Sequence, residues 1–326
     1  MIKLKQNIGK LKPLLISRSC AAMRHCRPGI WLLLIGLTAV SMAQQIPAQS
    51  LYRSRLLTAA HSFTSGVEGP GVDRAGNLYA VNYNHEGTIG KISPQGKAEV
   101  FLELPKGSVA NGIRFDHTGN MLIADYTGHS IWKLDMKTKS LALLAHEPGM
   151  SQPNDIALDN RGHIFASDPD WKAGTGKIWR IDADGTVSLL DSMKTVNGIE
   201  VSPDNRILYV NELLKIWAYS LSPGGEISGK RLVVEFPDFV LDGMRCDAAG
   251  NLYQTRFGKG MIAMISPKGK LLREIPLKGS KPTNVAFGGT DGRTLYVTMQ
   301  DQGNIETFRV SIPGREWKMI QKINNN

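Results

Sequence analysis

The strongest constraint on the fold is a pattern that the chain repeats six times. A polar turn followed by a short apolar run occurs first as "DRAGNLYA" and returns as "DHTGNMLIA", "DNRGHIFAS", "SPDNRILYV", "DAAGNLYQT" and "GGTDGRTLYV". The copies begin at positions 73, 116, 159, 202, 247 and 288, so the first three steps are 43 residues and the last two are 45 and 41. A period of this length predicts a repeat architecture in which each unit packs on its neighbours.

Each unit contains four short apolar runs separated by turn residues. In the third unit these are "NDIALD", "HIFAS", "GKIWRID" and "TVSLL", bounded by Asp, Asn and Gly. Four antiparallel strands in a unit of this length are typical of a propeller blade. The repeats therefore predict an all-β fold, a six-bladed β-propeller with four antiparallel strands per blade, as a single domain over residues 44–326. No segment shows the sustained 3.6-residue apolar period that a leucine-rich or helical solenoid needs.

Two segments compete to close the ring. "RSRLLTAAHSF" at 53–63 resembles the outermost strands of other units, such as "KAEVFLEL" and "SLALLAHE", although it precedes the first innermost strand. We expect it to complete the sixth blade and so to cover a strand edge that would otherwise be exposed. The alternative candidate for that place is "REWKMIQKI" at 315–323.

Residues 1–43 do not resemble a propeller unit. Arg24 and Arg27 precede an apolar run from Ile30 to Ala43 that ends in small residues. This pattern is typical of a secretory signal peptide, and the run is short for a bilayer span. We therefore expect a secreted or periplasmic protein, with no membrane attachment after cleavage. The alternative is an uncleaved N-terminal anchor.

The basic composition is largely a property of this first segment. The formal net charge is +10, but residues 1–43 hold seven basic and no acidic residues, so +3 remains without them. Nucleic-acid binding therefore has no support in the composition. Of the three cysteines only Cys246 lies beyond residue 43, which excludes a disulfide framework in the expected mature chain.

One position in each unit predicts a site on the axis. Counting five residues back from each turn gives a side chain that carries an oxygen atom. In a propeller the innermost strand begins beside the central axis, so equivalent positions converge there. The predicted ring consists of Glu68, Asn111, Asn154, Asn197, Asp242 and Thr283.

Two interpretations of this ring remain open from the residues alone. Such side chains can be turn caps that bond nearby backbone, which suits Asn111 and Thr283. Glu68 and Asp242 fit that interpretation badly, because two carboxylates in an enclosed channel repel each other and lose hydration. A cation between them removes the conflict. Carboxylate and amide oxygens favour Ca²⁺, with Mg²⁺ or Mn²⁺ as substitutes. Zn²⁺ is the least favoured substitute, because Cys246 stands alone and the histidines show no ligand spacing.

The loops after the second strand of each unit should flank this site. The histidines in them could act as acid or base, or be merely solvated. Asp168 in one of these loops is either a ligand at the rim or a turn former. Together with Asn111, the candidate substrate-binding residues are Tyr83, His85, Tyr126, His129, Asp168, Trp171 and Arg256.

Several segments resemble one known family. "GVEGP", "QPNDIALD", "VNGIEVSPD", "LDGMRCDAAGNLY" and "PTNVAFGG" are similar to motifs of the senescence marker protein, gluconolactonase and luciferin-regenerating enzyme family, and by extension of diisopropyl fluorophosphatase. The resemblance covers residues 62–310. It implies a six-bladed propeller that holds a catalytic divalent cation, usually calcium, on the axis and hydrolyses lactones or phosphoesters.

The resemblance also implies roles for single residues. Glu68 in "VEGP", Asn154 in "QPND", Asn197 in "VNGI" and Asp242 in "LDGM" match the family's metal ligands, whereas Asn111 matches none and is a neighbour of the site. The implied mechanism is Lewis-acid catalysis, with Asp242 as catalytic general base or as nucleophile. The loops "NYNHEG" and "NELLK" match no specificity residues of the sugar-lactone members, so the substrate stays open.

Two functions are therefore weighed. The first is a secreted or periplasmic calcium-dependent hydrolase, gluconolactonase-like, that acts on small-molecule lactones or related esters. The alternative is a non-catalytic propeller in which a structural calcium supports loops that bind a glycan or a protein. No sequence feature indicates an oligomeric state.

Overall fold

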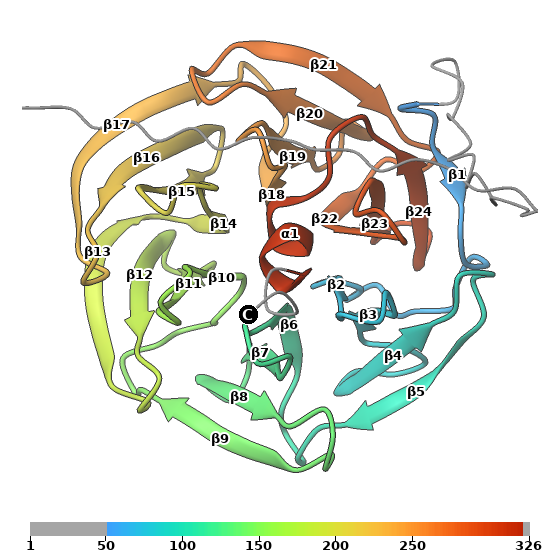
Figure 1. Cartoon of the computed structure of the whole chain (residues 1–326), viewed down its shortest axis with the longest axis horizontal. Coiled ribbons are helices and arrows are strands. Elements are labelled where there is room, and N and C mark those ends of the chain that lie inside the picture. The colour runs from blue at the N-terminus through green and yellow to red at the C-terminus, as the bar shows by residue number, and fades with distance from the viewer. Residues whose placement is uncertain (1–50, 322–326) are drawn as a thin grey trace, which may run out of the picture. The chain divides into compact units, whose positions relative to one another are not determined.

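The strands form a ring of sheets around a central axis (Figure 1). The structure is a computed structural model and describes residues 51–321. Within these residues there are six sheets of four antiparallel strands, which confirms the predicted six-bladed β-propeller. The predicted signal peptide, residues 1–43, lies outside the described residues. No helix found in the range 51–321 is long and apolar enough to cross a membrane.

Blades 1 to 3 each run outwards from the axis in chain order. Blade 1 contains β2 (Gly71–Val72), β3 (Leu78–Val81), β4 (Thr88–Ile92) and β5 (Ala98–Glu103). Blade 2 contains β6 (Ala110–Phe115), β7 (Met121–Asp125), β8 (Ser130–Leu134) and β9 (Leu141–His146). Blade 3 contains β10 (Ile156–Leu158), β11 (Ile164–Asp170), β12 (Thr175–Ile181) and β13 (Val187–Lys194).

Blades 4 and 5 follow the same order, and blade 6 combines the two ends of the ring. Blade 4 contains β14 (Val196–Val201), β15 (Ile207–Glu212), β16 (Lys215–Leu221) and β17 (Ile227–Glu235). Blade 5 contains β18 (Leu241–Cys246), β19 (Leu252–Arg256), β20 (Met261–Ile265) and β21 (Leu271–Pro276). Blade 6 contains β22 (Pro282–Gly288), β23 (Thr294–Met299), β24 (Asn304–Arg309) and β1 (Arg55–Leu56).

The repeated turn has a local cause. Oδ1 of Asp116 accepts hydrogen bonds from the backbone N–H groups of Thr118 and Asn120, both at 2.9 Å, and so closes the turn between β6 and β7. Gly119 in this turn has a φ of +89°, which glycine adopts without strain. Equivalent bonds are accepted by Asp73, Asp159 and Asp247. The repeated turn therefore follows the last residue of each innermost strand. This end of the strand is the one that lies away from the predicted ring.

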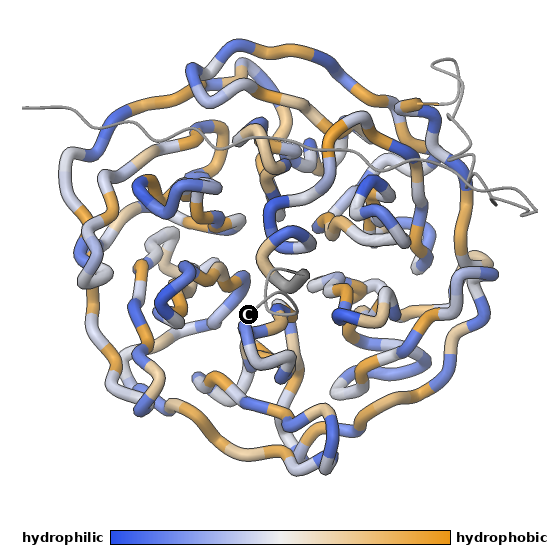
Figure 2. The backbone as a smooth tube through the Cα atoms, viewed as in Figure 1, coloured by the Kyte–Doolittle hydropathy of each residue, from blue (hydrophilic) through white to orange (hydrophobic). Residues whose placement is uncertain are grey.

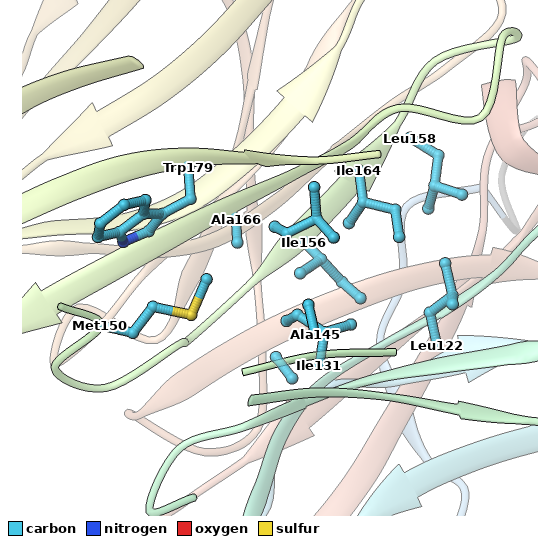
Figure 3. Close-up of a cluster of buried hydrophobic side chains, with 11 residues drawn as sticks. Leu122, Ile131, Ala145, Met150, Ile156, Leu158, Ile164, Ala166 and Trp179 are labelled. Atoms are coloured by element: carbon cyan, nitrogen blue, oxygen red, sulfur yellow. The ribbon is translucent and has the colours of Figure 1, made fainter. Parts of the chain in front are cut away.

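Apolar side chains between neighbouring blades form the core. One cluster joins Leu122 and Ile131 of blade 2 to Ile156, Ile164 and Trp179 of blade 3 (Figure 3). Apolar segments recur in the strands of every blade, whereas hydrophilic segments fall mainly at the turns (Figure 2). The described residues contain one such cluster for each pair of adjacent blades, so the ring is held by burial of blade faces against each other.

The ring is closed by the N-terminal segment of the described residues. β1 pairs antiparallel with β24, and Arg55 lies opposite Thr307. Phe63 belongs to the same buried cluster as Ile305, across the junction of blades 1 and 6. These contacts confirm that residues 53–63 complete the sixth blade. The alternative, in which the segment that begins at Arg315 completes the sixth blade, is wrong, because this segment forms a helix.

That helix, α1 (Arg315–Gln321), lies over the turn end of the central axis (Figure 1). Arg315 donates hydrogen bonds to the carbonyl oxygens of Leu158 at 2.8 Å and Ser202 at 3.2 Å, at the ends of the innermost strands of blades 3 and 4. It also pairs with the buried Glu200 at 3.4 Å. The helix therefore covers the end of the channel that is remote from the predicted ring.

Buried charges fill the channel between α1 and the ring. Asp155, which follows ring residue Asn154, pairs with Arg114 and with Arg245, each at 3.0 Å. Nε of Arg114 lies 2.5 Å from one oxygen of Glu316 in α1, and Nε of Arg245 lies 3.8 Å from the other. Because arginine does not lose its charge in proteins, removal of one of these carboxylates leaves a buried cation without its partner.

We expect Glu316→Ala to lower the free energy of unfolding by about 2 kcal/mol, because Arg114 and Arg245 lose a counter-charge in a buried site. Lys318→Ala, at an exposed position of the same helix, is the matched control and should change this free energy by less than about 0.5 kcal/mol. Urea denaturation followed by circular dichroism measures both. Equal losses in the two variants would show that the pairs to Glu316 do not stabilise the channel.

Candidate metal centre

A cavity of about 430 Å³ opens at the end of the channel opposite to α1. Its volume lies within the range of about 300–1,000 Å³ that is usual for small-molecule sites. All six positions of the predicted ring line it, because each lies at or just before the start of an innermost strand. These residues are Glu68, Asn111, Asn154, Asn197, Asp242 and Thr283. The structure thus brings the ring together, while the roles of its members stay predictions.

Glycines allow the ring to be narrow. A Cβ atom on Gly112, which follows Asn111, would lie 2.7 Å from the carbonyl oxygen of Asn154 in the next blade. A Cβ atom on Gly198 would lie 2.6 Å from the carbonyl oxygen of Asp242. Only a residue without a side chain permits innermost strands to approach this closely. The glycine after a ring residue therefore brings the ring residue of the neighbouring blade nearer to the axis.

Glu68, which is buried, and Asp242, which is half-buried, lie close together at the floor of the cavity. Burial raises the pKa of Glu68 from 4.5 to about 8; the hydrogen bond from the Gly69 N–H at 2.8 Å acts against this, and the charge of Asp155 adds to it. Burial is also the main cause that raises the pKa of Asp242 well above its ordinary range, followed by the charge of Glu68. Two carboxylates in one buried site are stable only if they retain a proton or bind a cation.

Asn154 and Asn197 present amide oxygens that lack partners. Both side chains are buried, and Oδ1 of each accepts no hydrogen bond from any described residue. A buried acceptor without a partner costs free energy, so a ligand that these oxygens can coordinate would stabilise the site. Together with Glu68 and Asp242 they form the all-oxygen donor set that a hard cation such as Ca²⁺ takes.

This donor set differs from the commoner metal sites of proteins. Within residues 51–321, no group of three or more His, Cys, Asp or Glu side chains is arranged to hold a metal ion. The predicted site therefore depends on its two amides as much as on its two carboxylates. The residues present fit a calcium ion, and their action as ligands stays a prediction.

The other two ring positions have partners within the protein. Nδ2 of Asn111 donates to the carbonyl oxygen of Asn154 at 3.3 Å, which supports its prediction as a neighbour of the site. Oγ1 of Thr283 donates to the carbonyl oxygen of Val67 at 2.9 Å and lies 2.8 Å from Oγ1 of Thr298. The hydroxyl of Thr283 is thus engaged in holding blades 1 and 6 together.

Two of the predicted substrate-binding residues of the rim, Tyr126 and Trp171, line the cavity. Gln152 connects them, because its Nε2 donates to Oη of Tyr126 at 2.8 Å and its Oε1 accepts the backbone N–H of Trp171 at 3.3 Å. One amide thus bonds both the hydroxyl group of Tyr126 and the backbone of Trp171 at the mouth. Their contact with a substrate stays a prediction.

Asp168 and Arg256 are buried and do not belong to the cavity lining. Oδ2 of Asp168 accepts the indole N–H of Trp179 at 2.8 Å. Arg256 pairs with Asp238 at 2.5 Å, and its guanidinium lies 3.9 Å from the ring centroid of Phe236. Internal partners therefore engage both side chains, and their contact with a substrate stays a prediction.

Tyr83, His85 and His129 also lie outside the lining. Tyr83 packs edge-to-face on Phe63 with ring centroids 5.3 Å apart, and its hydroxyl donates to the carbonyl oxygen of Ala98 at 2.9 Å. His85 is exposed, and His129 occupies a tight loop with a φ of +51°. The roles of these three side chains in substrate binding stay predictions.

Sequence reasoning missed two groups of residues. Three of the charged residues of the channel lie three residues after ring positions, so the counting that found the ring could have found them: they are Arg114, Glu200 and Arg245. The second group consists of apolar residues of the mouth, for which no motif gives a signal: they include Leu213, Val240 and Leu241.

The fold and the cavity define the class of this protein: a β-propeller with a site on its central axis that is lined by carboxylate and amide oxygens. Residues 66–301 match the family described as SMP-30/Gluconolactonase/LRE-like region, and the chain belongs to this family. This confirms the resemblance that the repeated motifs indicated.

Two relatives and one solved structure illustrate the membership. The chain is 28% identical over 253 residues to 6-deoxy-6-sulfogluconolactonase of Pseudomonas putida, a match that covers 70% of this chain and 85% of the relative. It is 27% identical over 197 residues to pentonolactonase XacC of Haloferax volcanii, over 59% of this chain and 67% of the relative. The calcium-binding protein regucalcin of Agrobacterium tumefaciens superposes with a TM-score of 0.70 at 22% identity, over 80% of this chain and 95% of that chain. This last likeness shows the fold.

In the metal-free protein we expect stability to fall as the pH rises from about 4.5 to about 8. The pKa of Glu68 is about 8 in the folded protein against 4.5 ordinarily, so its contribution is complete below the lower value and is lost as the pH rises through the higher one. Glu68→Gln removes this titration and should make the melting temperature less dependent on pH. Thermal unfolding in chelator at several pH values measures both proteins. The same pH dependence in both would contradict the role of Glu68.

Proposed function

We propose that this protein hydrolyses lactones with the help of a divalent cation, calcium being the expected metal. The observation that carries the proposal is the meeting of four oxygen donors at the floor of a cavity with an open mouth. They are the carboxylates of Glu68 and Asp242 and the unpartnered amide oxygens of Asn154 and Asn197. Family membership and two relatives that are named lactonases support it.

The expected reaction is addition of water across the ring ester bond. The water oxygen bonds to the carbonyl carbon, the ring carbon–oxygen bond breaks, and the ring oxygen takes a proton, which gives a hydroxy acid. A cation held by the four donors would supply a Lewis acid for the carbonyl oxygen and offset the negative charge that develops there.

Asp242 is the residue that we assign to accept the proton of the attacking water. It is partly exposed to the cavity, whereas Glu68 is buried. A general base needs access to the water molecule as well as a suitable pKa. Glu68 is therefore assigned to hold the metal, while Asn154 and Asn197 add ligands that do not compete for the proton. Direct attack by Asp242 on the carbonyl carbon is the alternative route.

Hydrolysis of a panel of lactones and aryl esters, with calcium and with chelator, tests the proposal. We expect turnover that chelator abolishes, and a fall in kcat of roughly 10²–10⁴-fold in Asp242→Asn, as for loss of a general base. Asn111→Ala is the matched control for Asn197→Ala and should cost much less activity, because Asn111 bonds backbone instead of holding an unpartnered oxygen.

Each outcome of this panel tests a different part of the proposal. Turnover that is insensitive to chelator would contradict the metal dependence. Calcium binding without turnover of any substrate would favour the non-catalytic propeller that binds a glycan or a protein. Equal losses in Asn111→Ala and Asn197→Ala would place Asn111 among the ligands.

We also propose that the protein is exported and that residues 1–43 are removed, on the basis of the basic and apolar pattern of this segment. Intact mass measurement on protein from the periplasm and from the medium tests this. A chain that starts near residue 44 is expected, and a precursor that remains inside the cell as the sole species would contradict export.

A further inference from the structure

The mouth of the cavity is apolar on one side. Trp171, Leu213 and Val240 line the cavity and are nevertheless 47%, 42% and 43% exposed. Leu241 and Phe257 line it beside them. These five residues, here named the apolar wall, come from blades 3, 4 and 5. Single exposed apolar side chains are ordinary in proteins, but several gathered at one cavity indicate a surface for a ligand.

Backbone hydrogen bonds connect the loops of blades 4 and 5, which carry four of the five residues of the apolar wall. The N–H of Leu241 donates to the carbonyl oxygen of Leu213 at 2.8 Å, and the N–H of Phe257 donates to the carbonyl oxygen of Val240 at 3.0 Å. These bonds fix the loops of blades 4 and 5 relative to each other. The wall is therefore a preformed surface, as is usual for small-molecule sites.

The backbone beside the wall is strained where it presents apolar side chains. Leu213 lies in the two-residue turn between β15 and β16 with a φ of +54°, and Phe239, next to Val240, has a φ of +49°. Turns of this kind favour Asn and Gly, since a bulky residue is strained at positive φ. An exposed leucine at such a position contributes little to the core, so its strain points to a role at the site.

The other side of the mouth is polar and comes from blades 1 and 6. Its side chains include Asn82, Glu86 and Gln300. Asn82 is engaged within the protein, because its Nδ2 donates to the carbonyl oxygen of Gly66 at 2.6 Å and its Oδ1 accepts the N–H of Gly87 at 3.2 Å. This side therefore offers chiefly Glu86 and Gln300 to a ligand. In a ring of six blades, blade 1 faces blade 4, so Glu86 faces the apolar wall across the axis.

We propose that the cavity binds a lactone with an apolar substituent, an alkyl or aryl group that lies against the apolar wall while the lactone ring reaches Glu68 and Asp242. This inference rests on the proposed function. An alkyl group would cover wall surface that is now exposed to water. The hydroxyl groups of a sugar lactone would instead face the wall, where no partner replaces the hydrogen bonds that they make with water.

Three substrates with the same six-membered ring ester test the inference: δ-valerolactone, its pentyl derivative δ-decalactone, and glucono-δ-lactone. With calcium present we expect kcat/KM for δ-decalactone to exceed that for δ-valerolactone by roughly several hundredfold, since each buried carbon atom of the pentyl group is worth about three- to fourfold. The kcat/KM for glucono-δ-lactone should be lower than that for δ-decalactone. Equal or faster turnover of glucono-δ-lactone would overturn the inference and leave the proposed hydrolase function standing.

Leu213→Asn tests the apolar wall itself. Asparagine tolerates positive φ, so the turn should be kept. We expect the ratio of kcat/KM for δ-decalactone to that for δ-valerolactone to fall by about tenfold, as two methylene groups lose their contact. Leu189→Asn, at an exposed leucine of β13 that does not line the cavity, is the matched control and should leave this ratio unchanged. An unchanged ratio in Leu213→Asn would contradict a role of the wall.

Calorimetric titration with the corresponding lactams, which resist hydrolysis, gives a readout that does not depend on activity. Absence of turnover for every lactone would refute the proposed function. The pentyl-substituted lactam should still bind more tightly than the unsubstituted one if the apolar wall takes such a group. Equal binding of the two, or none, would overturn the inference whether or not a lactone is turned over.

Discussion

Two carboxylates that lie close together at the axis set the main physical requirement of this structure. Glu68 lies just before the innermost strand of blade 1, Asp242 lies in the first part of the innermost strand of blade 5, and burial raises the pKa of both. Such a pair needs a proton or a cation to offset its charge. The unpartnered amide oxygens of Asn154 and Asn197 favour a cation, because protonation of the carboxylates would leave those oxygens without a ligand.

The part of the channel between the ring and α1 does not offer a second site for a cation, because its own charges are paired. Within residues 51–321 its charged side chains are three arginines and three carboxylates that pair with one another. They are Arg114, Arg245 and Arg315 with Asp155, Glu200 and Glu316. α1 supplies two of the six and covers the turn end of the axis. The ring at the opposite end is therefore open only towards the mouth of the cavity. The cavity thus has a polar floor, formed by the ring, and a mouth that is apolar on one side.

The period of the sequence was sufficient to predict the blades, the closing strand at 53–63 and the ring, because all three follow from one position repeated at a fixed spacing. The internal contacts of the rim residues could not be predicted in this way. Loop position alone could not show that Asp168 and Arg256 are used by Trp179 and Asp238. Leu213 carries no signal at all, since its place at the mouth depends on a strained turn that the sequence pattern would assign to Asn or Gly. α1 is too short for its apolar period to be recognised.

The most direct test of a cation site at Glu68 and Asp242 is calorimetric titration of the metal-free protein with calcium chloride at about pH 7, in two buffers with different heats of ionisation. The difference between the two measured enthalpies counts the protons that binding releases. Because the pKa of Glu68 is about 8 and that of Asp242 is raised as well, calcium should bind with release of roughly one proton or more. Binding without proton release, or no binding, would contradict a cation site built on these two carboxylates.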